Sequence, residues 1–262
     1  MKFIRLFLLT CLAFPLTTAC QATAKTAVTS TRVLPQLLTK SSAASIAGTP
    51  LFFQVSLPPA AAAPAAGWPL LLFLHGAGER GRDVSLIGVH GPLSLVDTID
   101  ELRSCVIVAP QCPTDAWWEH DALKTILDET RAAYPIDEKR IYVTGLSMGG
   151  YGTWDMLSRY PDLFAAAVPI CGGGDLTRLW EVPTQGFELG NLLLAKDVPI
   201  RAFHGEVDTV VPVEESRLLV DTLQAAGSSA TLTTYPGVGH NSWAQTYADP
   251  ELYKWLFAQV KR

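Results

Sequence analysis

The chain has 262 residues, of which 48% are hydrophobic and 17% are charged. This length suits one α/β domain with a targeting segment, and the composition supplies enough apolar material for a core and too little charge for a disordered chain. The formal net charge is −5 and the chain contains no basic block, so we expect no nucleic-acid partner.

The amino-terminal residues resemble a secretory signal peptide. Lys2 and Arg5 form a positive region, an apolar run covers 6–16, and small residues follow. The apolar run is too short to span a bilayer. We therefore expect residues 1–24 to be a signal peptide, with a buried first helix as the alternative. This prediction implies an exported protein that is periplasmic, extracellular or attached to the cell envelope by a lipid anchor.

Two cleavage patterns stay open in this segment. The run 22–24, Ala-Thr-Ala, suits an ordinary signal peptidase cutting near 24/25, whereas 16–20 resembles a bacterial lipobox cut near 19/20, with Cys20 lipidated. The large aliphatic Leu16 lies one position too far upstream for a regular lipobox. Residues 25–49 are rich in Ala, Ser and Thr, which predicts a tether with one poorly marked strand at most. The folded domain is predicted over 50–262.

Apolar runs that alternate with helical patterns predict a mostly parallel sheet with helices on both faces, an α/β fold. The first two strands are expected at 51–57 and 70–74, joined as a hairpin by the Ala/Pro stretch 58–67. Further strands are expected at 105–109, 140–144, 164–170, 198–203 and 230–235. Helices are expected at 86–103, 122–134, 151–160, 214–226 and 248–261. The segment between 170 and 198 is too short for a large lid.

The run Gly145-Leu146-Ser147-Met148-Gly149 matches G-x-S-x-G, a strand-turn-helix motif that exposes a serine. A predicted strand precedes it and a predicted helix follows it. The turn forces Ser147 into a strained backbone conformation, and Gly145 and Gly149 let the strand and the helix pass close together. The pattern alone is common by chance in a chain with 20 glycines. Its distant partners therefore decide its meaning.

A serine hydroxyl becomes a good nucleophile only when a base takes its proton, and a third group must orient that base. Asp208 follows the predicted strand at 198–203, and His240 follows the last predicted strand. Both should lie with Ser147 beyond the carboxyl ends of the strands. The chain order Ser, Asp, His is that of the α/β-hydrolases.

Five motifs in order resemble the secreted α/β-hydrolase family labelled predicted peptidases of the prolyl oligopeptidase type, whose relatives include feruloyl, acetyl and polyhydroxybutyrate esterases. The motifs are 75–81 (HGAGERG), 110–113 (PQCP) with Trp117, 145–150 (GLSMGG), 204–208 (HGEVD) with Val211-Pro212, and 239–243 (GHNSW). The match runs from about residue 51 to the carboxyl terminus. It implies the α/β-hydrolase fold without a large lid, with Ser147 as nucleophile, Asp208 as acid and His240 as base.

The resemblance implies a serine hydrolase of the carboxylesterase type, acting through an acyl-enzyme on small, carbohydrate-linked or polymer-borne esters such as feruloyl or acetyl esters. A peptidase of prolyl oligopeptidase type and a polyester depolymerase are the alternatives; no propeller domain precedes the hydrolase motifs, which favours an esterase. A non-catalytic binding protein of the same fold is a further alternative, disfavoured because all three predicted catalytic residues are present. We expect no metal or organic cofactor.

An oxyanion hole needs two fixed backbone amides. The residue after the nucleophile, Met148, should give one, and the loop after the 70–74 strand should give the other, from Ala77 or alternatively Gly78. We expect His75 and His204 to make structural hydrogen bonds.

Other residues near the predicted site have plainer interpretations. Trp117 and Trp118 either stack against an aromatic acyl group or a sugar, or cap the core. Trp243 is expected to steady the His240 loop by packing. The remaining polar residues are expected to form a local ion pair (Glu79, Arg80 and Asp83) or to lie on the surface (His90 and His120).

Three cysteines lie in the predicted domain. Cys105 is expected to be a core residue, and a disulfide between Cys112 and Cys171 is conceivable because both follow strand ends. Neither has the spacing of a zinc site. The sequence leaves the disulfide and oligomeric states open.

Overall fold

The computed structural model describes residues 35–59, 63–174 and 187–262. The chain divides into two units, Met1–Arg32 and Val33–Arg262, and only the second is described here. The predictions of a signal peptide and of a lipidated Cys20 therefore lie outside the described residues. Within the described ranges, none of the helices combines the length and the apolar character needed to cross a membrane.

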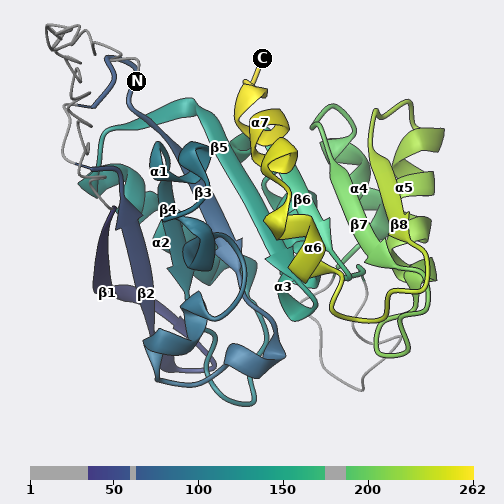
Figure 1. Cartoon of the computed structure of the whole chain (residues 1–262), viewed down its shortest axis with the longest axis horizontal. Coiled ribbons are helices and arrows are strands. Elements are labelled where there is room, and N and C mark those ends of the chain that lie inside the picture. The colour runs from purple at the N-terminus through teal and green to yellow at the C-terminus, as the bar shows by residue number, and fades with distance from the viewer. Residues whose placement is uncertain (1–34, 60–62, 175–186) are drawn as a thin grey trace, which may run out of the picture. The chain divides into compact units, whose positions relative to one another are not determined.

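A mostly parallel sheet forms the centre of the second unit (Figure 1), with the eight described strands in the order β1-β2-β4-β3-β5-β6-β7-β8. The strands are β1 (Gln36–Ile46), β2 (Thr49–Leu57), β3 (Trp68–Leu74), β4 (Val106–Pro110), β5 (Ile136–Leu146), β6 (Ala166–Ile170), β7 (Arg201–Gly205) and β8 (Thr231–Tyr235). β2 is antiparallel to both β1 and β4, and the other neighbouring pairs are parallel. The predicted α/β fold class is confirmed.

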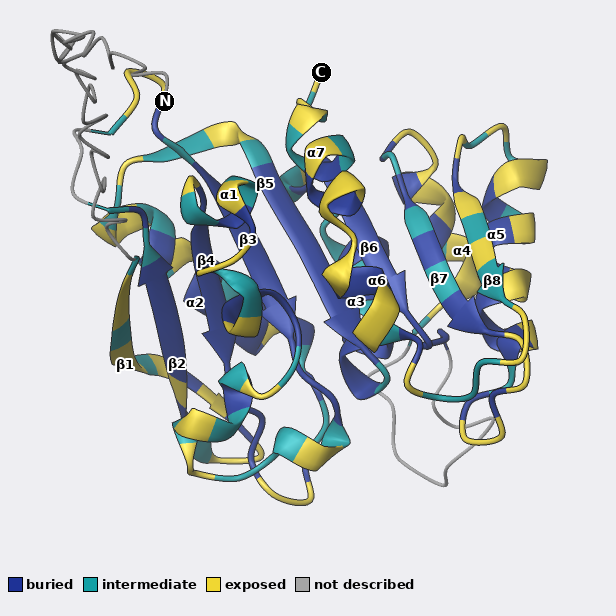
Figure 2. Cartoon of the chain, in the orientation of Figure 1, coloured by how far each residue is buried: buried dark blue, intermediate teal, exposed yellow. Residues whose placement is uncertain are grey.

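Helices cover both faces of this sheet, as predicted. They are α1 (Asp100–Arg103), α2 (His120–Ala133), α3 (Met148–Arg159), α4 (Leu189–Leu192), α5 (Val213–Ala225), α6 (Trp243–Ala248) and α7 (Pro250–Ala258), with the short 3-10 turns η1 (Ala77–Glu79), η2 (Val84–Gly88), η3 (Pro92–Leu95), η4 (Pro161–Leu163) and η6 (Leu193–Ala195). Strand side chains alternate between faces. Leu70 and Leu72 therefore pack with α2, α3, α4 and α5, whereas Leu71 and Phe73 pack with α1, α6 and α7. Figure 2 shows the buried strands between these layers.

The hairpin expected between 51–57 and 70–74 is wrong. β2 pairs with β4, and β3 lies between β4 and β5. Both β3 and β4 are almost wholly buried, as expected for parallel strands that are covered on both faces. β3 therefore lies in the middle of the sheet and does not form a hairpin with β2. The hairpin instead joins β1 to β2 through Ala47 and Gly48, whose φ angles of 48° and 73° are left-handed.

The amino-terminal boundary of the folded unit also differs from the prediction. Residues 36–46 form β1 and pair with β2, so the one poorly marked strand that the prediction allowed within the tether belongs to the sheet. The signal for this strand is weak because most of its side chains are exposed, while only Ala44 and Ile46 are buried. The sheet therefore begins before residue 50.

Two predicted helices are also corrected. The helix expected over 86–103 is three short segments, η2, η3 and α1. Gly91 has a left-handed φ of 79°, and a Cβ there would lie 2.4 Å from the Phe73 ring, so the chain turns sharply before Pro92. The helix expected over 248–261 is α7, which ends at Ala258 and follows the separate helix α6. Asp249 separates these two helices and caps α7 by accepting a hydrogen bond from the Glu251 amide.

Candidate active site

Ser147 occupies a tight turn between β5 and α3. Its φ and ψ angles are 53° and −116°, the strained conformation that the motif predicts. A Cβ on Gly145 would lie 2.2 Å from the Gly149 carbonyl oxygen, and one on Gly149 would lie 1.9 Å from the Leu74 carbonyl oxygen. Both glycines are therefore required for this close approach. The Ser147 amide donates to the Ile170 carbonyl at 2.9 Å, which fixes the turn at the carboxyl edge of the sheet.

The three predicted catalytic side chains meet at this edge. His240 Nε2 lies 2.8 Å from Ser147 Oγ, and His240 Nδ1 lies 2.7 Å from Asp208 Oδ2. Because a carboxylate only accepts hydrogen bonds, the imidazole proton belongs on Nδ1. Nε2 is then free to accept the hydroxyl proton of Ser147. The contacts form a continuous hydrogen-bond chain from carboxylate to hydroxyl.

The environment of Asp208 keeps this carboxyl ionised. Burial alone would raise its pKa, but hydrogen bonds from His204 and His240 and from the amides of Val210 and Val211 outweigh that effect and hold the pKa well below its usual range. The two amides lie 2.8 and 2.9 Å from Oδ1. A fixed negative charge therefore lies beside His240 and would stabilise its protonated form.

His75 and His204 make structural hydrogen bonds, as predicted. His75 Nδ1 donates to the Gly76 carbonyl at 2.6 Å, and Nε2 accepts from the Cys112 amide at 3.0 Å. Burial lowers the pKa of His75 to about 4, so its ring is neutral. His204 Nε2 donates to the Val211 carbonyl at 2.9 Å and also lies 3.3 Å from Asp208 Oδ2. This second contact, which connects His204 to the Asp208 carboxylate, is one that the sequence did not reveal.

Two backbone amides at the same edge are candidate oxyanion donors. Met148 is the first residue of α3, so its N–H has no acceptor within the helix. Ala77 is the first residue of η1 and follows β3 by two residues. Arg80 Nε donates to the Ala77 carbonyl at 3.1 Å, which fixes the orientation of that loop.

The structure separates the two neighbouring tryptophans predicted to contact substrate. Trp118 is only 8% exposed, its Nε1 donates to the His75 carbonyl at 3.3 Å, and its ring lies 4.8 Å from the His75 ring. These contacts support core packing for Trp118. Trp117 is half-buried, with the Arg80 guanidinium 5.8 Å from its ring centre, and its substrate contact stays a prediction. Trp243 packs edge-on against His240 at 5.3 Å between ring centres.

The polar residues after β3 differ from the expected local ion pair. Glu79 lies 4.0 Å from His75 Nδ1 and 3.9 Å from His90 Nε2, and burial raises its pKa. Arg80 instead donates to the carbonyls of Ala77 and Ala116, while Asp83 caps η2.

The surface position predicted for His120 is wrong. Its ring is largely buried between α2 and α3, with Nδ1 at 2.9 Å from Asp155 Oδ2. The prediction missed this contact because Asp155 is distant in sequence. His90, with a side chain that is 41% exposed, does lie at the surface.

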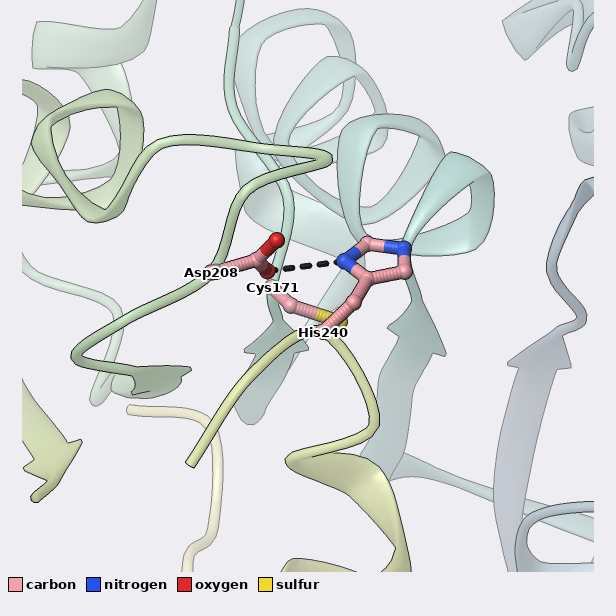
Figure 3. A group of neighbouring side chains, drawn as sticks. All are labelled: Cys171, Asp208 and His240. Atoms are coloured by element: carbon pink, nitrogen blue, oxygen red, sulfur yellow. Dashed lines mark hydrogen bonds and ion pairs between the residues drawn. The ribbon is translucent and has the colours of Figure 1, made fainter. Parts of the chain in front are cut away.

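The cysteines of the described unit are free thiols. Cys105, Cys112 and Cys171 are all buried and unpaired in disulfides, so the conceivable bridge between Cys112 and Cys171 is absent from the described part of the chain. Cys171 follows β6 and lies beside the Asp208–His240 pair, with its sulfur and the ligand atoms of Asp208 and His240 within 4.8 Å of one another (Figure 3). Its place directly after β6, next to the β5 edge that presents Ser147, is the signal that could have revealed this contact.

Comparison with known proteins identifies the family. Residues 119–252, just over half of the chain, match the phospholipase/carboxylesterase family of α/β-hydrolases. The poly(3-hydroxyoctanoate) depolymerase of Pseudomonas fluorescens is 28% identical over 209 residues, which cover 69% of this chain and 71% of that protein. A bifunctional acetylxylan esterase/xylanase of Neocallimastix patriciarum is 27% identical over 179 residues, covering 64% of this chain and 24% of that protein.

Solved structures agree with this family. The crystal structure of a thermostable esterase has a TM-score of 0.68 and 35% identity, over 86% of this chain and 63% of that chain. A ferulic acid esterase has a TM-score of 0.63 over 86% of this chain and 97% of that chain, and its 17% identity shows the fold alone. The chain spans less than two thirds of both the thermostable esterase and the xylanase. On the family match, the chain belongs to the phospholipase/carboxylesterase family and is a carboxylesterase-like enzyme.

Proposed function

We propose that this protein is a serine carboxylic ester hydrolase in which Ser147 is the nucleophile, His240 the general base and Asp208 the orienting acid. The observation that carries the proposal is the hydrogen-bond chain from Ser147 Oγ to His240 Nε2 at 2.8 Å and from His240 Nδ1 to Asp208 Oδ2 at 2.7 Å. Nucleophile, base and orienting group are within reach of one another without rearrangement.

In the acylation step, Ser147 Oγ attacks the ester carbonyl carbon while its proton passes to His240 Nε2. The carbonyl oxygen becomes an oxyanion, which the Met148 and Ala77 amides would bind. The C–O bond to the alcohol then breaks, and His240 returns the proton to the leaving alkoxide. Asp208 stays ionised throughout and stabilises the imidazolium.

In the deacylation step, water replaces the alcohol. His240 Nε2 takes a proton from the water as its oxygen attacks the acyl carbon, and the same two amides bind the second oxyanion. Collapse of this intermediate breaks the bond to Ser147 Oγ, which regains its proton from His240. The carboxylic acid leaves and the enzyme returns to its starting state.

The substrate class we propose is an ester that is small, carbohydrate-linked or polymer-borne. The acetylxylan esterase relative supports the carbohydrate-linked part of this class. Export follows from the proposed signal peptide over 1–24, and one relative of Arthroderma benhamiae is described as a secreted protein.

A substrate panel tests the proposal. Purified protein should hydrolyse p-nitrophenyl acetate, methyl ferulate and acetylated xylan, and Ser147→Ala should reduce kcat by about 10⁶-fold, to the background rate. A fluorophosphonate probe should label the folded protein at Ser147 and leave Ser147→Ala unlabelled. Cleavage of peptides without cleavage of any ester would overturn the esterase proposal, and a folded protein that the probe fails to label would indicate a non-catalytic binding protein.

A polyester depolymerase is the second candidate function. The relatives named poly(3-hydroxyoctanoate) depolymerase and poly(3-hydroxyalkanoate) depolymerase C favour it, the latter 48% identical over 52 residues, which are 20% of this chain and 13% of that protein. Release of 3-hydroxy acids from a polymer suspension would support it. If soluble esters are cleaved while the suspension is left intact, this candidate fails.

A further inference from the structure

We propose that Cys171, Asp208 and His240 form an inhibitory binding site for a soft divalent cation of the zinc class. The three side chains converge from the loops after β6, β7 and β8 (Figure 3), and their ligand atoms lie within 4.8 Å of one another. The inhibitory effect rests on the proposed function, because the cation would coordinate His240 and Asp208, the general base and the orienting acid of that mechanism. Cation binding itself can be measured without any hydrolysis.

The spacing of the donors is close to that of a tetrahedral zinc centre. Zinc bonds of about 2.3 Å to sulfur and about 2.0–2.1 Å to nitrogen and oxygen place neighbouring donor atoms roughly 3.3–3.6 Å apart. The His240 Nδ1 and Asp208 Oδ2 atoms would have to open from 2.7 Å. The sulfur, which lies within 4.8 Å of the other donors, would have to close in by at most about 1.2 Å. Side-chain rotation can supply movements of this size.

Backbone contacts fix the main chain of Cys171 at the site. Cys171 has a left-handed φ of 40°, and its amide donates to the Phe203 carbonyl at 2.8 Å. The thiol is fully buried, whereas the His240 side chain is 20% exposed. An ion can therefore approach from the His240 side, and the sulfur lies behind the imidazole as its innermost ligand.

A buried hydroxyl lies next to the thiol. Ser242 is 0% exposed and its side chain forms a hydrogen bond with Cys171. A charge is less costly to bury beside such a polar group than against apolar side chains alone.

The donor set selects the cation by chemistry. A thiolate, an imidazole and a carboxylate suit Zn²⁺ and its softer congener Cd²⁺, whereas Mg²⁺ prefers oxygen donors only. On binding, the S–H bond of Cys171 breaks, its proton leaves to solvent, and a sulfur–metal bond forms. The His240 proton moves from Nδ1 to Nε2 as the Nδ1 lone pair binds the cation, so no oxidant or reductant is needed.

This tautomer change would switch off the proposed mechanism. With a proton already on Nε2, His240 cannot accept the Ser147 proton. Cation binding and acceptance of the Ser147 proton are therefore mutually exclusive at His240.

Direct binding of Cd²⁺ gives the first test. Titration of the full-length protein with Cd²⁺ should produce an ultraviolet thiolate-to-cadmium charge-transfer band. The absorbance of this band should be lower in Cys171→Ala by the amount that this site contributes. Cys112→Ala is the matched control, because Cys112 is also a buried free thiol. It should keep the full band. An equal band in wild type and Cys171→Ala would overturn the proposal.

His240→Gln keeps the test decisive if Cys171→Ala fails to fold. This variant alters a partly exposed side chain and should also lose the band. Ser147→Ala removes no ligand and should retain it. If the wild-type protein shows the band but hydrolyses none of the esters tested, the proposed function is refuted while the metal site is supported.

Inhibition gives the second test. Zn²⁺ should inhibit ester hydrolysis by the wild-type protein, Mg²⁺ should not, and the Zn²⁺ inhibition constant should rise at least tenfold in Cys171→Ala, each variant being compared with its own metal-free rate. Equal inhibition constants in wild type and Cys171→Ala would overturn the proposal.

Discussion

Two histidine–aspartate pairs with the same contact lie in different parts of this molecule. His240 Nδ1 is 2.7 Å from Asp208 Oδ2, at the carboxyl edge of the sheet, and His120 Nδ1 is 2.9 Å from Asp155 Oδ2, between α2 and α3. The second ring nitrogen distinguishes them. In His240 it meets the hydroxyl of Ser147 at 2.8 Å, whereas in His120 it faces a further carboxylate, that of Asp121, at 3.8 Å.

The surroundings of each pair explain why only one resembles a catalytic base. The hydrogen bond that His120 donates to Asp155 raises the pKa of His120; burial opposes this shift in part, and the charges of Asp155 and Asp121 add to it. The second nitrogen of His120 faces the Asp121 carboxylate, which has no proton to transfer. His240 has a single carboxylate on one side and a nucleophile on the other. A histidine–aspartate contact therefore indicates catalysis only when the other nitrogen faces a group that must lose a proton.

The largest expected effect separates the two pairs directly. Asp208→Asn should lower kcat for p-nitrophenyl acetate by about 10⁴-fold. The neutral asparagine side chain can neither hold the required His240 tautomer nor stabilise the imidazolium as the carboxylate does. Asp155→Asn should leave kcat within about twofold, since it lies outside the hydrogen-bond chain of the site. Steady-state kinetics on both variants checks this. Similar losses in the two variants would contradict the distinction between the pairs.

The second expected effect concerns the candidate oxyanion donors, Met148 and Ala77. Ala77→Pro removes one N–H. The preceding Gly76 is extended, with φ and ψ of −80° and 178°, a conformation that proline accepts. We expect kcat to fall by about 10²–10³-fold with little change in KM. Gly78→Ala is the control, since a Cβ there meets nothing within 4 Å. Equal rates in Ala77→Pro and wild type would assign the donor elsewhere.

The third expected effect is smaller and concerns His204, the second imidazole beside Asp208. His204→Leu removes an N–H at 3.3 Å from Asp208 Oδ2, so the pKa of Asp208 should rise. A hydrogen bond to a charged group is worth about 1.5–3 kcal/mol, which predicts a loss in kcat of about tenfold or more and an acid limb of the pH–rate profile shifted to higher pH. Ser216→Ala, which removes the partner of Nδ1, should leave the acid limb in place. An unshifted acid limb in His204→Leu would reduce His204 to a packing role.

The sequence predicted the parallel middle of the sheet well because apolar runs and the serine turn carry strong local signals. β3 and β6 are buried on both faces, and each reads as a continuous apolar run. The prediction from sequence failed where a strand pairs with another that is distant along the chain. The pairing of β2 with β4, rather than with β3, depends on the whole sheet, and β1 has too few buried side chains to show a pattern.

The same limit applies to the candidate site. Ser147, Asp208 and His240 were predictable from motifs because each follows a strand end. The burial of Trp118 against His75 and the approach of Cys171 to the catalytic pair depend on which loops lie side by side. His120 was misplaced for the same reason, since its partner Asp155 lies on another helix.

The smallest expected effect is the pH dependence of stability from His120. Its pKa is raised in the folded state, so its stabilisation is complete below the unfolded-state value, about 6.5, and is lost as the pH rises through the higher folded-state value. The side chains of His120 and Asp155 are 11% and 19% exposed, so solvent limits the contribution to about 1 kcal/mol or less. Urea unfolding at pH 6 and pH 8.5 should show wild type losing this increment, whereas His120→Gln and Asp155→Asn should show a flatter dependence. An equal slope in all three proteins would mean that the pair carries no charge-dependent stability, and the contrast with His240 would then rest on geometry alone.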